Sequence, residues 1–129
     1  MDRPKILIVD DDEDICEILT AYLIDIFEEI EVTCCYDGGK ALHNINFHKY
    51  DYIFFDLNIP TIDGVDLIKA TRNRENSDKT EIYVISGNID HMAKKCLMEL
   101  HIRGALHKPF TYDDICEMIN HAQNRFFYN

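Results

Sequence analysis

Near its start the chain reads KILIVDDDED (residues 5–14). The first half of this run is apolar and rich in β-branched residues, which is typical of a strand buried on both faces of a parallel sheet. The acids that follow, Asp10, Asp11 and Asp12 first, would repel one another at the mouth of such a strand unless a cation lies among them. Carboxylate oxygens are preferred ligands of Mg²⁺. The run therefore predicts a strand that ends in a divalent-cation site, with Mg²⁺ as the expected ion.

The bulk composition limits the classes of function. With 129 residues, the chain is expected to form one domain over residues 1–129. Its formal net charge of −11 argues against a nucleic-acid-binding domain, which would carry a basic surface, and against binding to an anionic membrane. No apolar stretch approaches the length of a membrane span, and the first residues lack the apolar core of a signal peptide.

The cysteines indicate a reducing compartment. Their number is odd, they lie within apolar patterns, and none belongs to a Cys-x-x-Cys pair: Cys16, Cys34, Cys35, Cys96 and Cys116. We therefore expect reduced thiols that serve as small core residues, in a protein that resides in the cytoplasm.

Apolar runs and helical stripes alternate along the chain. After the first strand, short apolar runs predict strands at residues 32–36, 52–55, 82–85 and 105–107. Apolar residues at helical spacing predict helices around residues 15–26, 41–45, 65–68, 89–100 and 115–122. Asp12 or Asp14 is expected to cap the first helix, and the polar residues 72–80 predict a solvated loop.

Two of these helices carry apolar residues whose role we interpret as packing. In the first helix, Ile15, Ile18 and Leu19 belong to a stripe that is expected to face the sheet. In the fourth, Met92, Cys96 and Met98 fit helix packing better than a functional stripe.

The alternation of five strands with five helices predicts a doubly wound α/β fold. A flavodoxin-like (βα)5 sheet would have five parallel strands in the order 2-1-3-4-5, with helices on both faces. Right-handed crossovers place every strand's carboxyl end at one edge of the sheet, and ligands bind beyond that edge. The functional residues are therefore sought where the strands end.

Polar side chains stand at four of the predicted strand ends. Asp10 and Asp11 follow the first strand, and Asp56 follows the third. Ser86 follows the fourth strand and Lys108 the fifth. Asp10, Asp11 and Asp56 bring about three negative charges, which Mg²⁺ and Lys108 together would balance. Such a site can keep Asp56 ionised so that its oxygen attacks a phosphorus atom and forms an aspartyl phosphate. Lys108 and Ser86 can then bind the oxygens of the phosphoryl group.

These residues resemble a known family. The matching segments are Val9-Asp10-Asp11, the run Phe55–Pro60 with Asp63-Gly64, Ser86-Gly87, and Lys108-Pro109-Phe110. In this order and at this spacing they resemble the receiver domain of bacterial two-component response regulators, over essentially the whole chain. The resemblance implies a phosphoprotein that takes part in a phosphorelay and signal transduction, without conventional enzymatic turnover.

By that resemblance, Asp56 accepts the phosphoryl group from the phosphohistidine of a histidine kinase or phosphotransfer protein. The resemblance also implies that Asp11 ligates Mg²⁺ directly, that Asp10 acts largely through water, and that Asn58 contributes its backbone carbonyl.

For the phosphoryl group itself, the resemblance implies that Lys108 pairs with its oxygens and that Ser86 is the switch hydroxyl. Gly87 is the small residue that usually follows this hydroxyl. The bond between Lys108 and Pro109 is expected to be cis.

The chain departs from the family pattern at one position. Receivers commonly carry an aromatic residue three positions before the lysine, and it swings inward on activation, whereas this chain has Ala105. We therefore expect the switch to run through the loop and helix after Ser86. Asn58 and Asn88 occupy positions where the family tunes dephosphorylation.

The resemblance also implies an output surface and partners. The face formed by the fourth helix, fifth strand and fifth helix corresponds to residues 89–100, 105–107 and 111–125. A downstream protein or output domain would bind there, and a homodimer formed on phosphorylation is left open. No output domain is expected within residues 1–129, and this domain is expected to bind neither nucleic acid nor membrane.

Three other classes of function can be weighed on the residues alone. A phosphorylation-independent interaction module is compatible with Ala105. An aspartyl-phosphate phosphatase of the haloacid dehalogenase type needs an acid two residues after its nucleophile, where this chain has Asn58. A flavodoxin-like FMN site needs a loop after the first strand that can bind the flavin phosphate. The acids at residues 10–14 would repel that phosphate.

Overall fold

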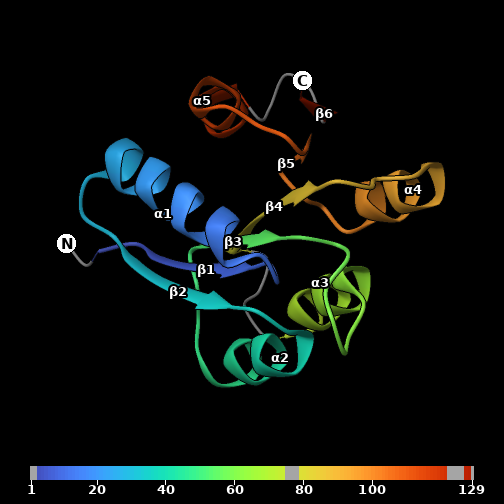
Figure 1. Cartoon of the computed structure of the whole chain (residues 1–129). Coiled ribbons are helices and arrows are strands. Elements are labelled where there is room, and N and C mark those ends of the chain that lie inside the picture. Colours follow the sequence, from blue (N-terminus) through green and yellow to red (C-terminus); the bar gives the residue numbers. More distant parts are fainter. Residues whose placement is uncertain (1–2, 75–78, 122–126, 129) are drawn as a thin grey trace.

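The computed structural model describes residues 3–74, 79–121, 127 and 128. Its strands form one parallel sheet in the order β2-β1-β3-β4-β5-β6 (Figure 1). The strands are β1 (Lys5–Val9), β2 (Glu31–Cys35), β3 (Tyr52–Phe55), β4 (Glu81–Ser86), β5 (Gly104–His107) and β6 (Phe127–Tyr128). The first five strands follow the predicted order, so the flavodoxin-like, doubly wound α/β fold is confirmed.

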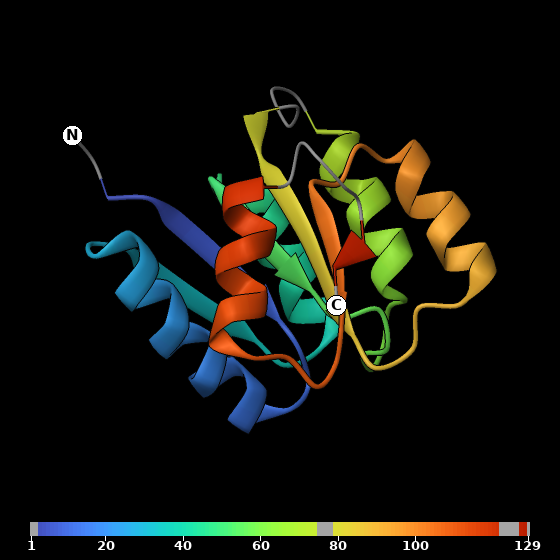
Figure 2. The ribbon, with the colours of Figure 1, turned by 90° about the horizontal axis from the view of Figure 1, so that it is seen from above.

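Helices cover both faces of this sheet. They are α1 (Glu13–Phe27), α2 (Gly38–Phe47), α3 (Gly64–Arg72), α4 (His91–Glu99) and α5 (Tyr112–His121). In the view from above, α1 and α5 lie on one side of the strands, and α2, α3 and α4 lie on the other (Figure 2). None of the described helices is long and apolar enough to cross a membrane.

Alternate residues of the strands serve two separate apolar clusters. Along β1, Leu7 and Val9 pack with the residues beneath α2, α3 and α4, whereas Ile6 and Ile8 pack with those beneath α1 and α5. All four side chains are at most 1% exposed. A strand covered on both faces has no polar side, which is why its sequence reads as a continuous apolar run.

Aspartates begin four of the helices. Asp12, Asp37, Asp63 and Asp90 are the N-cap residues of α1, α2, α3 and α4, and each side chain accepts hydrogen bonds from backbone N–H groups of the first turn. These N–H groups have no partner within the helix, so the carboxylates satisfy them and also favour the positive end of the helix dipole. Of the two caps proposed for the first helix, Asp12 is the one used.

Three predicted core residues are exposed instead. Ile18 is 43% exposed because Cys16, Leu19 and Leu23 form the buried stripe of α1. Met92 is 77% and Met98 61% exposed on α4, so the predicted packing role is wrong for both. Leu97 is the residue of α4 that is fully buried against the sheet.

The predicted loop at residues 72–80 begins one residue too early, because residue 72 still belongs to α3. Arg72 is the last residue of α3, and its guanidinium donates hydrogen bonds to three backbone carbonyls. The acceptors are Leu100 at 2.9 Å, Thr80 at 2.8 Å and His101 at 2.9 Å. Arg72 therefore ties the end of α3 to the end of α4 and to the residue that precedes β4.

The sequence pattern did not predict β6. Phe127 and Tyr128 pair in parallel with Ala105 and Leu106 of β5. A strand of two residues has no periodicity to detect. Residue 122, the last of the predicted fifth helix, and residue 125, the end of the predicted output surface, lie outside the described residues.

Candidate functional site

The backbone register of β1 and β3 brings two acids together. Val9 lies opposite Phe55, and the N–H of Asp56 donates to the carbonyl of Val9 at 2.8 Å. The N–H of Asp10 donates to the carbonyl of Cys35 at 3.0 Å. Both acids are therefore held immediately beyond the last ladder pair of the central strands, where parallel strands expose their carboxyl ends.

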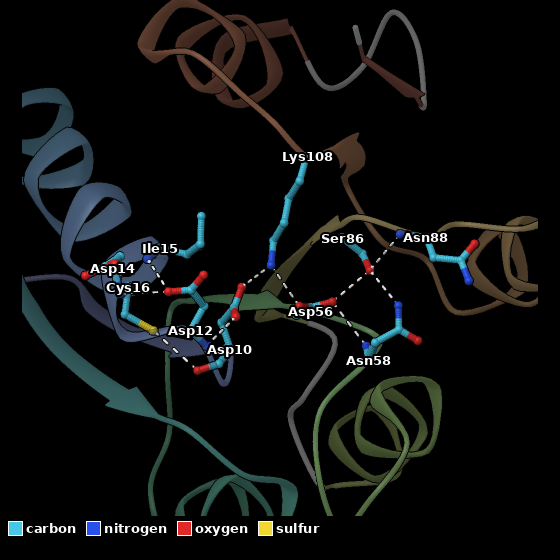
Figure 3. A network of polar contacts seen from close by, with 10 residues as sticks. All are labelled: Asp10, Asp12, Asp14, Ile15, Cys16, Asp56, Asn58, Ser86, Asn88 and Lys108. Carbon is cyan, nitrogen blue, oxygen red and sulfur yellow. Dashed lines mark hydrogen bonds and ion pairs between the residues drawn. The ribbon is translucent and has the colours of Figure 1, made fainter.

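The register of β4 and β5 places Ser86 and Lys108 at the same edge. Ser86 lies opposite His107, and the N–H of Lys108 donates to the carbonyl of Ser86 at 3.0 Å. The bond between Lys108 and Pro109 is cis. In Figure 3 the long side chain of Lys108 reaches down between Asp10 and Asp56, and Ser86 approaches Asp56 from the opposite side.

The ammonium of Lys108 contacts both buried acids. Its Nζ lies 2.6 Å from Oδ2 of Asp10 and 2.8 Å from Oδ2 of Asp56. Asp10 is 3% exposed and Asp56 5%. Two carboxylates of this burial need a cation nearby, and Lys108 supplies one positive charge for two negative ones.

The other oxygen of Asp56 belongs to a network that reaches the loop before α4. Ser86 Oγ donates to Oδ1 of Asp56 at 2.7 Å, and the N–H of Asn58 donates to the same oxygen at 3.1 Å. Ser86 Oγ in turn accepts from the side-chain amide of Asn58 at 3.3 Å and from the N–H of Asn88 at 3.4 Å. Figure 3 shows this chain of contacts from Asp56 to the loop that precedes α4. Asp56 is therefore linked to that loop through the hydroxyl of Ser86.

Electrostatics at the site reflect an excess of negative charge. Burial raises the pKa of Asp10, and this outweighs the hydrogen bonds from Lys108 and from the N–H of Asp12, while the charge of Asp56 raises it further. Burial lowers the pKa of Lys108, but its hydrogen bonds to Asp10 and Asp56 outweigh burial and raise it overall. Lys108 is thus firmly protonated, and a further cation would relieve the repulsion that remains.

One group of acids in the described part of the chain is arranged to hold such a cation. Oxygens of Asp10, Asp11 and Asp56 all lie within 4.8 Å of one another, and Asp11 is exposed to solvent. We call these three residues the acid cluster. Mg²⁺ prefers oxygen ligands and keeps several of its waters when it is bound to a protein. A cluster of carboxylates in which Asp11 faces solvent suits such an ion. The residues present therefore fit the predicted ion.

The structure places the remaining predicted residues around this centre. Gly87 follows Ser86 in the loop before α4, where an added Cβ would meet nothing within 4 Å. Ala105 is 1% exposed and packs in the cluster beneath α2, α3 and α4. The position of the family's moving aromatic is thus filled here by a small, fully buried side chain.

Two features of the site were missed in the sequence. The side chain of Asn58 contacts Ser86, a contact that the sequence pattern did not predict. The thiol of Cys16 donates to the carbonyl of Asp10 at 3.5 Å. Neither contact has a signal in the sequence, because both depend on the path of the loops that follow β1 and β3.

Comparison with known proteins agrees with this geometry. A family model described as the response regulator receiver domain matches residues 6–120. The chain is 30% identical over 112 residues to the transcriptional regulatory protein PrrA of Mycobacterium leprae, covering 87% of this chain and 46% of that protein. It is 28% identical over 115 residues to the response regulator ArlR of Staphylococcus aureus, covering 89% of this chain and 50% of that protein. The chain therefore spans about half the length of these curated relatives.

Solved structures give the same result. The chemotaxis response regulator CheY4 of Vibrio cholerae superposes with a TM-score of 0.81 at 26% identity, covering 94% of this chain and 99% of that one. The receiver domain of the sensor histidine kinase PA1611 of Pseudomonas aeruginosa has a TM-score of 0.77 at 23% identity, covering 92% and 96%. That structure holds a magnesium ion coordinated in its active site cleft. The family match over most of the chain, joined to the acids, hydroxyl and lysine at the strand ends, shows that this chain belongs to the response regulator receiver domain family of two-component signalling.

Proposed function

We propose that the domain accepts a phosphoryl group on Asp56 from the phosphohistidine of a histidine kinase or phosphotransfer protein, in a reaction that depends on Mg²⁺. The observation that carries the proposal is the environment of Asp56. Its buried carboxylate is bound at one oxygen by Lys108 and at the other by Ser86, beside the two further acids of the cluster. A nucleophile, a cation for the incoming group and a hydroxyl that can respond to it therefore share one edge of the sheet.

In the proposed reaction, an oxygen of Asp56 attacks the phosphorus atom. The new O–P bond forms as the P–N bond to the donor imidazole breaks, and the imidazole leaves as the neutral ring after taking a proton. Asp10, Asp11, Asp56 and the backbone carbonyl of Asn58 would hold Mg²⁺, which when bound neutralises the charge that gathers on the phosphoryl oxygens. Lys108 is placed to exchange its contact with Asp56 for one with the phosphoryl group.

The proposed switch begins at Ser86. Its hydroxyl now donates to Asp56, and a phosphoryl group there offers three strong acceptor oxygens in place of one carboxylate oxygen. Because Ser86 also accepts from the N–H of Asn88, a shift of its hydroxyl alters the loop before α4. Ala105 has no ring to move, so this loop is the route that the described contacts support.

The output surface remains a proposal based on the family. It comprises residues 89–100, 105–107 and the described part of 111–125. The exposed Met92 and Met98 lie within this surface and offer apolar contacts to a partner. A phosphorylated state shifts partner binding only by the difference in free energy with which the partner binds the two conformations. The pairing of β6 with β5 means that a partner at the β5 edge would meet β6 there.

The remaining parts of the proposal concern the setting of the domain. We assign it a role as a slow phosphoacceptor in the cytoplasm rather than as an enzyme, with a downstream protein or output domain as partner. A homodimer on phosphorylation is an outcome to be measured. A phosphorylation-independent module is the second candidate, and the small side chain of Ala105 is the observation that favours it.

The proposal is tested with phosphoramidate, a small donor whose P–N bond resembles that of phosphohistidine. In the presence of Mg²⁺ the protein should gain a phosphoryl group that hydroxylamine removes, because hydroxylamine cleaves acyl phosphates and leaves phosphate esters of serine intact. Ser86→Ala should still be labelled, whereas Asp56→Asn should not. Label that resists hydroxylamine, or that persists in Asp56→Asn, would contradict the assignment of the acceptor.

A further inference from the structure

Two cysteines meet directly behind the acid cluster, at the contact of α1 with β2. Cys16, in the first turns of α1, is 1% exposed, and its thiol donates to the carbonyl of Asp10 at 3.5 Å (Figure 3). Cys34, in β2, is half-buried. Both belong to the apolar cluster beneath α1 and α5. The two thiols come from elements that are separate along the chain but share one face of the sheet.

Thr20 shows how closely Cys34 approaches α1. Its Oγ1 lies 3.8 Å from the sulfur of Cys34. Because Thr20 stands four residues after Cys16, both side chains lie on the same face of the helix, one turn apart. The two thiols are also close enough for each to shift the pKa of the other. A half-buried thiol and a buried thiol are therefore neighbours across the contact of α1 with β2.

The neighbouring cysteine does not share this contact. Cys35 follows Cys34 in β2, so its side chain points to the opposite face of the sheet. There it packs with the residues beneath α2, α3 and α4, and its sulfur accepts from the side-chain amide of Asn44 at 3.0 Å. Cys96, in α4, also lies on that side. The geometry thus favours Cys16 over Cys35 and Cys96 as the partner of Cys34.

We propose that Cys16 and Cys34 form a dithiol that a hydroperoxide oxidises to a disulfide, and that this oxidation hinders phosphoryl transfer to Asp56. Partial exposure of Cys34 admits a small oxidant, and the buried Cys16 is in place to resolve the product. The neighbouring thiol of Cys16 lowers the pKa of Cys34, against the effect of burial, and so favours the reactive thiolate. The claim that the disulfide hinders phosphoryl transfer to Asp56 rests on the function proposed above.

The chemistry balances with one peroxide for each pair. The Cys34 sulfur attacks one oxygen of hydrogen peroxide, an S–O bond forms, the O–O bond breaks, and the hydroxide released takes the thiol proton to become water. The Cys16 sulfur then attacks Cys34, the S–S bond forms, the S–O bond breaks, and a second water leaves with the Cys16 proton. Two thiols are oxidised by two electrons while the peroxide is reduced to two waters.

A disulfide would act on the site through Asp10. It removes the thiol proton that Cys16 now donates to the Asp10 carbonyl. It also draws the two sulfurs to about 2 Å, which shifts the first turns of α1 against β2. The N–H of Asp12, the cap of that helix, donates to Oδ1 of Asp10 at 2.9 Å, so a shift of the helix start displaces a carboxylate of the acid cluster.

The first readout is the disulfide itself, in the whole reduced chain. After treatment with hydrogen peroxide, the intact mass should fall by two hydrogen atoms, and peptide mapping should join Cys16 to Cys34. The control Cys96→Ser should form the same bond. Cys34→Ser should not form it, and Cys16→Ser should stop at a sulfenic acid on Cys34 that dimedone traps. Peptide mapping of the disulfide uses the unaltered chain, so it tests the Cys16–Cys34 bond even if Cys16→Ser does not fold.

Two results would overturn the dithiol. One is that Cys34 remains a thiol under peroxide while Cys96 or Cys116 reacts, and the other is that the mapped bond joins Cys34 to a different cysteine.

The second readout is the rate of labelling by acetyl phosphate with Mg²⁺. The oxidised protein should be labelled about tenfold more slowly than the reduced protein, since misplacing a reacting group by about 1 Å can cost up to 10²-fold. A thiol reductant should restore the rate, and Cys34→Ser should be insensitive to peroxide. Equal rates for the mapped disulfide and the reduced protein would overturn the coupling to Asp56. Failure of the reduced protein to label at all would instead contradict the proposed function, while the disulfide result would stand.

Discussion

Lys108 is a single cation that contacts two buried carboxylates, at 2.6 Å from Asp10 and 2.8 Å from Asp56. Lys108→Met should therefore leave two buried charges without a partner when no divalent cation is present. We expect the free energy of unfolding at neutral pH to fall by about 2–4 kcal/mol. Urea denaturation in a chelating buffer measures this, and added Mg²⁺ should recover part of the loss.

The matched control for this prediction is Lys95→Met. Lys95 is an exposed residue of α4, so its substitution should change stability by less than about 0.5 kcal/mol. If Lys108→Met were as stable as the unaltered protein without metal, Lys108 would not be balancing the buried charge.

Tyr83 provides a test of burial through pH. Its ring is 1% exposed and stacks on Phe54 at 5.1 Å, and burial raises the pKa of its hydroxyl to about 12 from the ordinary 10.0. Between these values the folded state holds the proton more tightly than the unfolded state, so stability falls as pH rises. Two pKa units correspond to about 2–3 kcal/mol.

Tyr83→Phe keeps the ring and removes the titrating group. We expect the variant to be within about 1 kcal/mol of the unaltered protein at neutral pH, and to gain on it in urea denaturation as pH rises above about 10. If the difference in free energy of unfolding between Tyr83→Phe and the unaltered protein stayed constant across this pH range, ionisation of Tyr83 would not destabilise the folded state.

The residues that meet at the site could be predicted because each directly follows or ends an apolar strand. Parallel topology then carries Asp10, Asp56, Ser86 and Lys108 to one edge regardless of their separation in sequence. The amide of Asn58 on Ser86 could not be predicted in the same way. Such contacts depend on the dihedral angles of loops, which hydrophobic periodicity does not encode.

At the scale of the elements, the start of α3 lies against the backbone of the segment that carries the acceptor. A Cβ added at Gly64 would lie 2.5 Å from the Cα of Leu57 and 2.7 Å from the carbonyl oxygen of Asp56. Because these are backbone atoms, Gly64→Ala should displace either α3 or the segment that carries the acceptor. We expect a loss of about 1–3 kcal/mol in stability, measured by urea denaturation, and slower labelling of Asp56.

Gly87→Ala is the control for Gly64→Ala. At Gly87 an added Cβ meets nothing within 4 Å, and no described glycine has a positive φ. The substitution should therefore change stability by less than about 0.5 kcal/mol. Equal tolerance at the two glycines would show that α3 does not constrain the acceptor segment.

The elements differ in how well the sequence predicts them. The bounds of β1 and β3 match the predicted ones because each apolar run ends abruptly at an acid. The exposed faces of α1 and α4 were not predicted correctly, since Ile18 and Met92 are apolar yet face solvent. Periodicity identifies a helix, but it does not determine which of two neighbouring apolar stripes meets the sheet.

At the scale of the whole molecule, a cation bound only by the folded state should stabilise the fold. Mg²⁺ at about ten times its dissociation constant should add about 1.4 kcal/mol to the free energy of unfolding. Asp11→Asn should abolish most of this gain, and because Asp11 is exposed, its substitution leaves the core intact. Thermal unfolding with and without Mg²⁺ measures the effect.

The control for the ion is Asp113→Asn, which removes an exposed acid from the first turn of α5. It should keep the full stabilisation by Mg²⁺. If both variants responded to Mg²⁺ as the unaltered protein does, the ion would not be held by the acid cluster.

The topology of the whole sheet could be predicted from the sequence, apart from β6. Five apolar runs separated by helical stripes leave few arrangements once crossovers are right-handed. Among the described residues, the added strand pairs two with β5, and nothing in its own sequence requires that pairing.

The central claim is that Asp56 is an Mg²⁺-dependent phosphoryl acceptor, and the intact mass of the protein after incubation with acetyl phosphate tests it most directly. We predict that the unaltered protein with Mg²⁺ gains one phosphoryl group. The same protein in a chelating buffer and the Asp56→Asn variant with Mg²⁺ should both keep their starting mass. A folded protein that binds Mg²⁺ and gains no phosphoryl group would contradict the account and favour a phosphorylation-independent module.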